Sequence, residues 1–467
     1  MGTNDITTKN IRKGVFWNSI NSIAKYGLVF IGTIVLARIL TPEDYGLIGI
    51  MTVFITVAEV LIDSGLGGAI IKKKQVSEID YSTLTVYNGV TSIIIYVIFY
   101  FSAPFISKFY DKPILEDLLR LYSIVILIFS ITIVPRVRLI KQLQFKTLSI
   151  ISLVAGICGL ITAICLALMG FGVISLIWQY IINALVTSIL LWTISKYKIK
   201  LKFSYQSFKE QFAFGMSTTL ANSLKAISDN IYANVIGKIS TITQTGYYSQ
   251  SLRLANVPTN FLFNLIDSTF FPIFSQQTDK NDFIVKFNKI NIRTVQIIII
   301  LFGAAFSICK ELIHILLGDQ WIEATHTLEI LLISSMFISL ANIGRNILKC
   351  LGETFLILKV EGYLFILSLI LLSIVIFQSY YYVVYAFLVV SIIKAISMCY
   401  ISYRKLNISI ITFIKPTIKV MIWTFLAILL ACSVNYLNLA YYISLILKLF
   451  IFILTIGIWY IGFSKTK

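Results

Sequence analysis

Long apolar stretches, separated by short polar segments, run through almost the whole chain and constrain its fold more than any other feature. A helix that crosses a bilayer needs about 20 mostly apolar residues, and the sequence offers about 14 windows of that kind. Hydrophobic residues make up 58% of the chain and charged residues only 13%, whereas a soluble domain carries roughly 25% charged residues. The chain is therefore predicted to be an all-α polytopic membrane protein with about 14 transmembrane helices.

The predicted spans lie approximately at Gly14–Leu36, Gly46–Gly67, Leu84–Pro104, Leu118–Pro135, Leu148–Leu168, Gly172–Ile194, Phe212–Ile236, Tyr247–Pro272, Thr294–Leu317, Leu328–Leu348, Phe355–Phe377, Tyr381–Tyr403, Thr417–Asn435 and Tyr441–Gly462.

The distribution of basic residues predicts the orientation. Most of the 39 Lys and Arg residues fall on alternate inter-span segments, and segments rich in Lys and Arg stay in the cytoplasm. This pattern places both termini in the cytoplasm and requires an even number of spans. The apolar run from Gly14 is too long for a signal peptide and is interpreted as the retained first span. The net charge of +18 does not indicate nucleic-acid binding, because the basic residues are scattered between apolar runs.

Nothing in the sequence predicts an enzyme, a metal or a cofactor. The six cysteines lie in or beside apolar runs without a CxxC pair, which is typical of buried thiols. His314 and His326 have no acids at a metal-ligand spacing in the sequence. The polar segments are short, so no domain outside the membrane is predicted to fold alone. Acidic residues such as Glu311 and Glu323 are expected on short outer loops.

Two stretches roughly 200 residues apart share their order of motifs, which predicts an internal repeat. Asn21-Ser22 and Leu61–Ser64 (LIDS) recur as Asn222-Ser223 and Leu265–Ser268 (LIDS). The period covers about six spans, so both copies enter the membrane from the same side and form a parallel repeat about an axis along the membrane normal. The predicted organisation is an N-lobe over residues 1–203, a C-lobe over 204–405 and an extra helix pair over 406–467. Two such lobes around a midplane site are typical of a transporter.

The two helices that begin the repeats each carry amides and a lysine at mid-depth. A charge there costs about 2.5–3.5 kcal/mol and persists only beside a partner or a wet cavity. Asn21 and Lys25 share one helix face, as do Asn222 and Lys225. They predict a cationic wall for an anionic ligand, with a structural role of Lys25 as the alternative. Lys225 and Asp229, four residues apart, can also simply neutralise each other.

Like-charged acids and isolated arginines complete the set of candidate site residues. Glu59 and Asp63 lie four residues apart on one face and will not both stay ionised without help. They predict an ion-coupling site, with a structural ion pair to Lys25 or to a neighbouring helix as the alternative. The other candidates for coupling or gating are Asp229 and Asp267. Arg253 and Arg345 are candidate ligand contacts because a planar guanidinium suits phosphate oxygens, although Arg345, near the cytoplasmic end of its span, can also simply snorkel to the interface. Lys394 and Lys448 are weaker candidates.

Five motifs, in order along the chain, resemble one family. They are Leu36–Gly46 (LARILTPEDYG), Asp63–Leu66 (DSGL), Ser228–Lys238, Tyr248–Pro258 and Leu317–Trp321 (LGDQW). Together they resemble the signature of polysaccharide flippases of the Wzx type and cover about two thirds of the chain. Each motif alone is weak, and Arg345 has no counterpart in the pattern.

The resemblance implies a MATE-like two-lobe fold with a pseudo-twofold axis along the membrane normal. It implies a substrate of oligosaccharide linked through pyrophosphate to undecaprenol, flipped from the cytoplasmic to the periplasmic leaflet of a bacterial inner membrane. Lys25, Lys225 and Arg253 would then supply cations for the pyrophosphate. The resemblance further suggests a proton or sodium gradient as the driving force, with membrane lipids and other polysaccharide-assembly proteins as partners.

Two other functions remain open at this point. A multidrug exporter of the same superfamily would favour an acidic cavity, whereas the first span carries Lys25 and no acid. A membrane glycosyltransferase or polymerase acting on the same lipid-linked sugars would need catalytic acids or histidines on a sizeable outer loop, and the outer loops are short.

Overall fold

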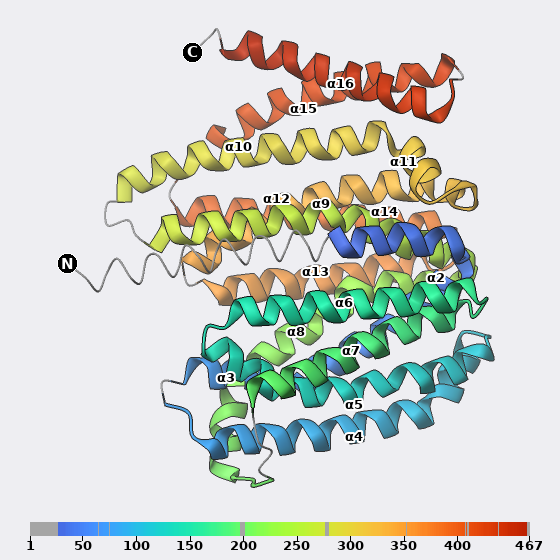
Figure 1. Ribbon diagram of the computed structural model, residues 1–467. Coiled ribbons are helices and arrows are strands. Elements are labelled where there is room, and N and C mark those ends of the chain that lie inside the picture. Colours follow the sequence, from blue (N-terminus) through green and yellow to red (C-terminus); the bar gives the residue numbers. More distant parts are fainter. Residues whose placement is uncertain are drawn as a thin grey trace. The chain divides into compact units, whose positions relative to one another are not determined.

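The computed structural model describes residues 27–63, 65–73, 75–196, 201–275, 280–351, 353–406, 408, 411–437 and 439–464. Within these ranges the chain is almost entirely helical and contains no strand (Figure 1). The prediction of an all-α polytopic protein is therefore confirmed for the described residues. Inside these ranges several stretches of side chains are not described, including all of those in 263–290 and 411–416.

The first half begins with a short helix, Gly27–Ile39, which covers the described part of the first predicted span. The helices that follow are α2 (Pro42–Asp63), α3 (Leu66–Lys72), α4 (Glu78–Phe109), α5 (Ile114–Lys141), α6 (Phe145–Leu168), α7 (Val173–Ser195) and α8 (Tyr205–Ile239).

The second half continues with α9 (Ile242–Ser275), α10 (Lys280–Ser307), α11 (Cys309–Leu316), the 3₁₀ turn η1 (Asp319–Ala324), α12 (Thr325–Cys350), α13 (Thr354–Val375), α14 (Tyr380–Lys405), α15 (Ile411–Cys432), the 3₁₀ turn η2 (Ser433–Leu437) and α16 (Tyr441–Ser464).

Ten described helices are long and apolar enough to cross a membrane, and a bent pair raises the number to at most 11. The bend lies at the junction of α10 and α11, where the segments Asn291–Ser307 and Cys309–Leu316 meet at 66°. Helices α8 and α9, with 35 and 34 residues, are long enough to span but richer in polar residues. The total of 14 spans stays a prediction.

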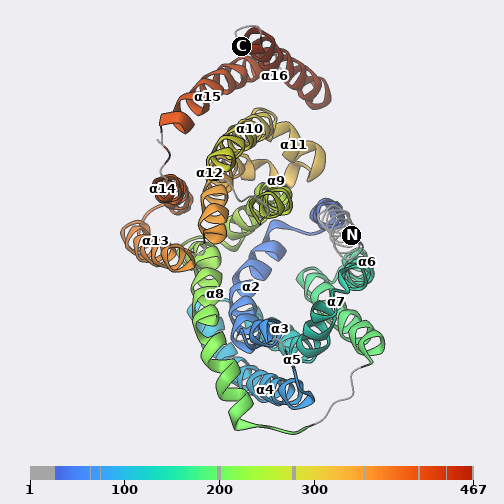
Figure 2. The same ribbon diagram turned by 90° about the vertical axis from the view of Figure 1, so that its left-hand side faces the viewer.

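The chain divides into two compact units, residues 1–246 and 247–467. In the first unit, α8 runs beside α2 and also contacts α3 and α4 (Figure 2). The helix that was assigned to the C-lobe from the sequence thus packs within the first unit. The predicted lobe boundaries rest on the repeat rather than on packing, so they stay a prediction.

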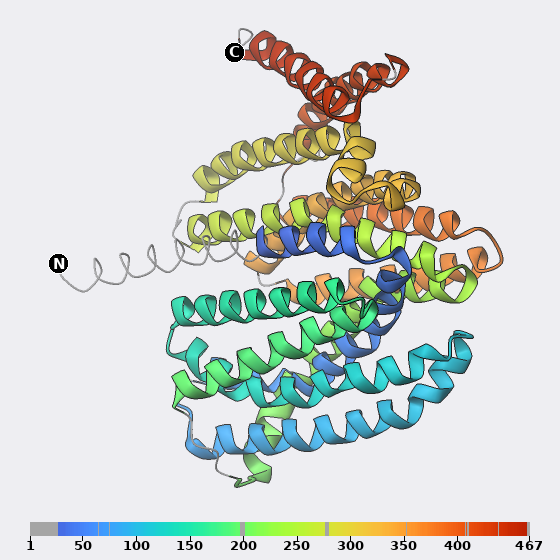
Figure 3. The same cartoon turned by 45° about the vertical axis from the view of Figure 1, so that its right-hand side comes forward.

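Each unit contains a row of helices packed side by side. In the first unit the neighbours follow the order α4, α5, α7 and α6 (Figure 3). Gly32 of the helix Gly27–Ile39 and Gly159 of α6 face a neighbouring helix so closely that a β-carbon would collide, as is typical of helix contacts in membranes. In the second unit the order is α13, α14, α12, α10, α15 and α16.

The turns that precede α2 and α9 are built alike. Before α2, the Thr41 amide and hydroxyl each donate to an Asp44 carboxylate oxygen at 2.9 Å. Before α9, the Thr241 amide donates to the Gln244 side chain at 3.4 Å, and the Gln244 amide donates back to the Thr241 hydroxyl at 3.1 Å. Such reciprocal caps satisfy backbone groups at a helix start. The two turns are equivalent in sequence position and in hydrogen bonding.

These two turns also pack against each other reciprocally. A β-carbon at Gly46 would collide with the backbone of Ile242, and one at Gly246 would collide with the backbone of Pro42. Only glycine permits so close a backbone approach at both positions.

Candidate functional site

Several predicted site residues fall outside what the structure describes. Asn21 and Lys25 precede residue 27 and lie outside the described residues. Asn222 and Lys225 belong to α8 and Asp267 to α9, but their side chains are not described. Their assignment to a cationic wall or to ion coupling therefore stays a prediction.

The two acids of α2 have a cationic neighbour that sequence reasoning missed. Glu59 and Asp63 are both half-buried, and the charge of Arg136 on α5 acts on each of them. The α2 and α5 helices pack directly against each other. The carboxylates therefore share one described counter-charge, which comes from another helix.

Arg136 reaches this position because α5 continues past its predicted end. The predicted span ended at Pro135, before Arg136, yet α5 includes Pro135 and ends only at Lys141. A proline inside a helix lacks an N–H and leaves the carbonyl four residues earlier without its helical donor. Here the indole N–H of Trp192 on α7 donates to that carbonyl, Ile131 O, at 3.2 Å. The helix continues because a neighbouring helix satisfies the freed group.

The two other cations at the end of α5 already have partners. The Arg138 guanidinium lies 5.9 Å from the ring centroid of Tyr81, at cation–π distance. Lys141 Nζ donates to the Ile70 carbonyl at 3.0 Å and also to the carbonyl of Lys73. A lysine on these carbonyls caps the C-terminal end of α3 and complements its dipole.

Close backbone contacts fix the junction of α2, α3, α5 and α8. Gly65 has a φ of +62°, which only glycine adopts without strain, and a β-carbon there would lie 2.7 Å from the carbonyl oxygen of Gly215 on α8. A β-carbon on Gly67 would lie 2.9 Å from Val137 of α5 and 3.2 Å from a carboxylate oxygen of Asp63. Asp63 is thus held at the point where α2, α3 and α5 meet.

A polar network ties the start of α4 to the start of α8. Lys73 Nζ lies 3.1 Å from Asp80 and 3.3 Å from Glu210, and the Ser207 hydroxyl donates to Asp80. Partial burial acts to lower the pKa of Lys73, but hydrogen bonds and charges of both acids hold that pKa above its ordinary value. The network joins segments far apart in the sequence.

The second unit holds the two predicted arginines, but well apart. Arg253 of α9 is half-buried and engaged by other groups. In the described part of the chain, Nε of Arg345 on α12 is buried without a hydrogen-bond partner. The Ser339 hydroxyl of α12 donates to the Thr259 hydroxyl of α9 at 3.5 Å. This contact shows how the two helices align along their axes. At 1.5 Å per residue, Arg253 and Arg345 then lie roughly 18 Å apart along the helix axes, too far to share one pyrophosphate.

Two lysines within the spans of the second unit form ion pairs. Lys448 Nζ of α16 lies 2.6 Å from Glu311 of α11, and both side chains are almost completely buried, at 2% and 3% exposure. Lys394 of α14 lies 2.8 Å from Glu361 of α13. The expectation that Glu311 lies on an outer loop is wrong, because α11 folds back onto α16 and buries it. These lysines are committed to acids rather than to a ligand.

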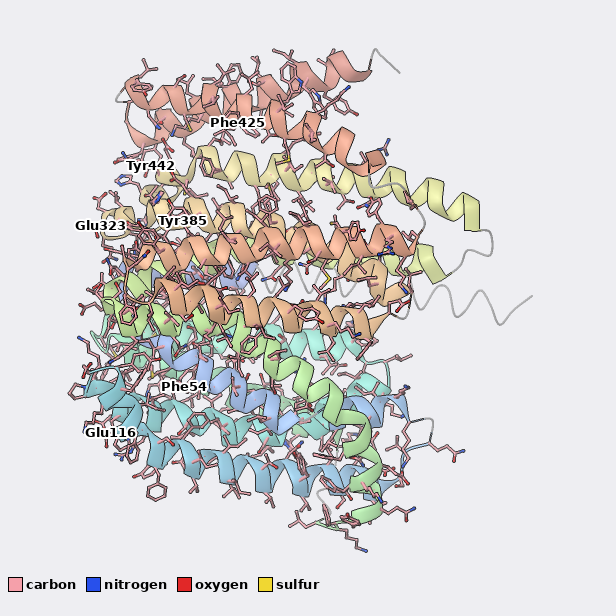
Figure 4. All side chains as sticks on the ribbon, turned by 180° about the vertical axis from the view of Figure 1, so that it is seen from behind. Phe54, Glu116, Glu323, Tyr385, Phe425 and Tyr442 are labelled. Atoms are coloured by element: carbon pink, nitrogen blue, oxygen red, sulfur yellow. The ribbon has the colours of Figure 1, made fainter. Side chains whose placement is uncertain are left out.

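Aromatic and acidic side chains gather at one end of the second unit. Glu323 of η1 and Tyr385 of α14 both lie there (Figure 4). His326 Nε2 lies 3.0 Å from the Tyr385 hydroxyl, and its Nδ1 lies 3.4 Å from Glu329. His314 similarly contacts a single acid, Asp319, at 2.6 Å. No group of three or more His, Cys, Asp or Glu side chains that could hold a metal occurs among the described residues.

Comparison with known sequences places most of the chain in one family. The profile of a family described as polysaccharide biosynthesis protein matches residues 35–326. The succinoglycan biosynthesis transport protein ExoT of Rhizobium meliloti is 25% identical over 357 residues, covering 75% of this chain and 71% of that protein. The lipopolysaccharide biosynthesis protein WzxC of Escherichia coli is 24% identical over 336 residues, covering 70% and 68%.

Two solved structures with the same fold are described as a lipid flippase and as a multidrug transporter. The lipid II flippase MurJ, in an inward closed conformation, superposes with a TM-score of 0.76 at 15% identity, covering 96% of this chain and 99% of that one. An inward-facing multidrug resistance transporter of the MATE family superposes with a TM-score of 0.58 at 14% identity, covering 84% and 98%. At such low identity these similarities establish the fold and nothing further.

Proposed function

Because this chain belongs to the polysaccharide biosynthesis protein family, we propose that it is a flippase for an undecaprenyl-pyrophosphate-linked oligosaccharide. The resemblance to Wzx-type flippases is confirmed by the family match and by relatives of that kind. The chain is a multi-pass membrane transport protein and not an enzyme. In the proposal, the lipid-linked sugar moves from the cytoplasmic to the periplasmic leaflet of a bacterial inner membrane by alternating access, with both termini in the cytoplasm.

The family match over residues 35–326 is the observation that carries this proposal. It covers most of the predicted N-lobe and more than half of the predicted C-lobe. Two relatives that match about as much of the chain are named for succinoglycan and lipopolysaccharide biosynthesis. A multidrug exporter shares the fold but not the family, so it is the less favoured alternative. A glycosyltransferase or polymerase finds no support in the family or in the short loops.

The proposed architecture has 14 spans in two lobes about a pseudo-twofold axis along the membrane normal. The reciprocal contact of Gly46 with Ile242 and of Gly246 with Pro42 supports such an axis. In a parallel repeat, equivalent residues exchange contacts across the axis. The matching caps at Thr41 and Thr241 add to this support.

The proposed site uses one set of residues for the ligand and another for the driving ion. Lys25, Lys225 and Arg253 contact the pyrophosphate, with Asn21 and Asn222 beside them, and Arg345 meets the ligand at another level. Glu59 and Asp63, together with Asp229 and Asp267, serve ion coupling or gating. One proton or sodium ion crossing 100 mV supplies about 2.3 kcal/mol, enough to bias a two-state transporter.

Reconstitution into liposomes tests the proposal. Purified protein is inserted into vesicles that carry a fluorescent undecaprenyl-pyrophosphate oligosaccharide, and access of a membrane-impermeant quencher or lectin reports its leaflet. We expect the wild type to move the lipid and Lys25→Ala, Lys225→Ala and Arg253→Ala to slow it at least about tenfold, since each removes a charged contact. Lys108→Ala, near the end of α4, is the matched control.

Two results would contradict the proposal. If the wild type leaves the sugar lipid in place with an ion gradient imposed, the flippase assignment fails for that substrate. If the same vesicles then accumulate a small organic cation, the multidrug exporter replaces it. If the three site variants move the lipid as fast as Lys108→Ala does, then Lys25, Lys225 and Arg253 are not part of the site. The flippase assignment itself would stand.

A further inference from the structure

The Arg136 side chain presents unused hydrogen-bond donors beside two carboxylates. It is exposed, and within the described part of the chain it interacts with Glu59 and Asp63 through its charge, without a hydrogen bond. A guanidinium offers five N–H donors in a planar fork that matches phosphate oxygens. An arginine in an apolar span with its donors open is equipped to bind an anion.

The backbone holds Arg136 at this position. It follows Pro135 directly, and the Trp192 bond to Ile131 stabilises the helix across the proline. Five residues later Lys141 anchors the end of α5 to α3. The segment that carries the guanidinium is therefore fixed on both sides, which is what a preorganised contact requires.

The other charges on the helices around α2 are accounted for. Helices α4, α5, α7 and α8 pack against α2. At this end of them, Arg138 faces the Tyr81 ring, and Asp80 is held by Lys73 and Ser207. Asp229 of α8 has interactions of its own, and no charged residue lies on α7. Lys25 and Lys225 belong to the proposed site, and the test includes a Lys25 variant.

An anion at Arg136 changes the electrostatics of Glu59 and Asp63 in two ways. It draws the guanidinium into hydrogen bonds of its own, and it brings further negative charge next to the carboxylates. Nearby negative charge favours the neutral form of a carboxyl group, and loss of a nearby cation acts in the same direction. Both effects therefore favour proton binding when the anion is present.

We infer that Arg136 is a further pyrophosphate contact and that its occupation is linked to proton uptake by Glu59 and Asp63. This inference rests on the proposed function, which supplies the pyrophosphate-linked substrate. It adds a residue of α5 to the site and makes the proton, rather than sodium, the coupled ion. Linkage is reciprocal, so the anion binds more tightly at low pH by the same factor by which it promotes protonation.

The experiment uses the full-length protein in nanodiscs of neutral phosphatidylcholine, with farnesyl pyrophosphate as a soluble probe. Affinity is measured at pH 5.5 and 7.5, and proton uptake is followed with a pH indicator in weak buffer. We expect binding about tenfold tighter at the lower pH, within the usual range of coupling between sites. A Glu59→Gln/Asp63→Asn variant supplies the background, because the probe's own titration is common to both proteins.

Four variants separate Arg136 from its surroundings. Arg136→Gln should weaken probe binding at least about tenfold and abolish the excess proton uptake. Arg136→Lys keeps the charge but loses the fork, so it should bind weakly yet retain part of the uptake. Arg138→Gln, two residues away on the Tyr81 ring, is the matched control and should bind as the wild type does. Lys25→Ala should weaken binding without removing the proton linkage.

Three results would overturn the inference. The first is a probe affinity of Arg136→Gln equal to that of the wild type. The second is a loss of affinity in Arg138→Gln as large as that in Arg136→Gln. The third is proton uptake by the Glu59→Gln/Asp63→Asn variant equal to that of the wild type. Nanodiscs containing phosphatidylglycerol distinguish a membrane lipid from the substrate. If that lipid alone produces the uptake and the probe does not displace it, the occupant is a lipid headgroup and the substrate assignment is wrong.

Failure of this inference and failure of the proposed function give different results. If the wild type flips the sugar lipid and Arg136→Gln does so at an equal rate, Arg136 leaves the site while the flippase stands. If the wild type does not flip the sugar lipid but the linked binding of probe and proton is observed, the anion site stands and its transported substrate is a different one.

Discussion

Two sets of charges lie among the apolar helices, and they are built in opposite ways. In the second unit, one lysine meets one glutamate: Lys448 and Glu311 lie 2.6 Å apart, almost without exposure. In the first unit, one arginine serves two acids: Arg136 is exposed and acts on Glu59 and Asp63 at longer range. The first arrangement is neutral and closed. Among the residues that the structure describes, the second has two carboxylates for one cation, and that cation has no hydrogen bond.

The difference separates a structural role from a functional one. The closed pair joins α16 to the bent segment α11 and is completed by the Ser444 hydroxyl, which donates to Glu311 at 2.6 Å. A buried pair of this kind resists loss of either partner, because the remaining charge has no compensation. The open group of Arg136, Glu59 and Asp63 can bind a proton on a carboxylate when an anion binds the guanidinium, so the added negative charge is compensated. We therefore expect substitutions in the closed pair to affect stability, and those in the open group to affect transport.

The largest effect should follow from breaking the closed pair. Lys448→Met removes the cation but keeps much of the volume, and we expect a loss of about 3–5 kcal/mol in the free energy of unfolding. Unfolding in mixed detergent micelles measures it. The double variant Glu311→Gln/Lys448→Met should recover most of that loss. Lys310→Met, next to Glu311 on α11, should change the unfolding free energy little. A double variant as unstable as the single one would show that packing, not charge, decides.

A smaller loss is expected at Lys394. Its pair with Glu361 is less completely buried, at 16% and 17%, so the charge left behind is less desolvated, and protonation of Glu361 can compensate part of it. Lys394→Met should lower the unfolding free energy by about 1–3 kcal/mol, measured in the same assay. A loss larger than that of Lys448→Met would contradict the ordering by burial.

A variant of Trp192 tests whether its hydrogen bond to Ile131 helps to position Arg136. Trp192→Phe removes the N–H that satisfies the Ile131 carbonyl, and one such bond contributes about 1 kcal/mol to stability. Transport should fall more than this loss explains, because the segment after Pro135 becomes less well placed. Trp178→Phe on the same helix is the matched control. Equal transport rates in the two variants would show that the proline segment holds its position without the indole.

The open group itself should tolerate loss of its cation. Arg136→Gln is expected to cost less than about 1 kcal/mol of stability, since the carboxylates can be neutralised by protons instead of remaining charged and unpaired. The unfolding assay applied to Lys448→Met provides the comparison. A loss near that of Lys448→Met would show that the two charge sets are equivalent after all.

The smallest effect concerns the exposed pair of Lys73 and Glu210. With the Glu210 side chain 55% exposed, Glu210→Gln should change stability by less than about 0.5 kcal/mol. The raised pKa of Lys73 means that its contribution is complete below the ordinary value of 10.5 and is lost only at higher pH. Unfolding measured between pH 6 and 9 should therefore show no dependence on this lysine. A clear slope there that Lys73→Met abolishes would contradict the assignment.

Much of the fold could be predicted because span length and hydropathy are local properties. Each predicted span with described residues overlaps a helix, although Gly46–Gly67 runs past the end of α2 into α3 and Thr294–Leu317 crosses the bend between α10 and α11. The errors occurred at ends and bends. The chain was expected to leave the helix at Pro135, but an indole from another helix replaces the missing bond. Likewise Glu311 was placed on a loop, because nothing local signals the 66° bend that turns α11 onto α16.

The candidate site was less predictable than the fold. Sequence spacing identified Glu59 and Asp63 as two acids in need of a cation, and the structure supplies Arg136 from a helix more than 70 residues away. The signal available was an arginine directly after a proline at a span end, which is also what an ordinary loop looks like. Arg253 and Arg345 were correctly placed within helices, but their separation depends on how α9 and α12 align.

The sequence by itself determined that this chain is a helical membrane protein of the polysaccharide biosynthesis family, because apolar length and ordered motifs are written along the chain. Only the tertiary structure decided which charges meet. In helices apolar on nearly every face, periodicity does not define the rotation about the helix axis. Lys448 is therefore assigned to Glu311, and Arg136 to the acids of α2, only by the packing that brings those helices together.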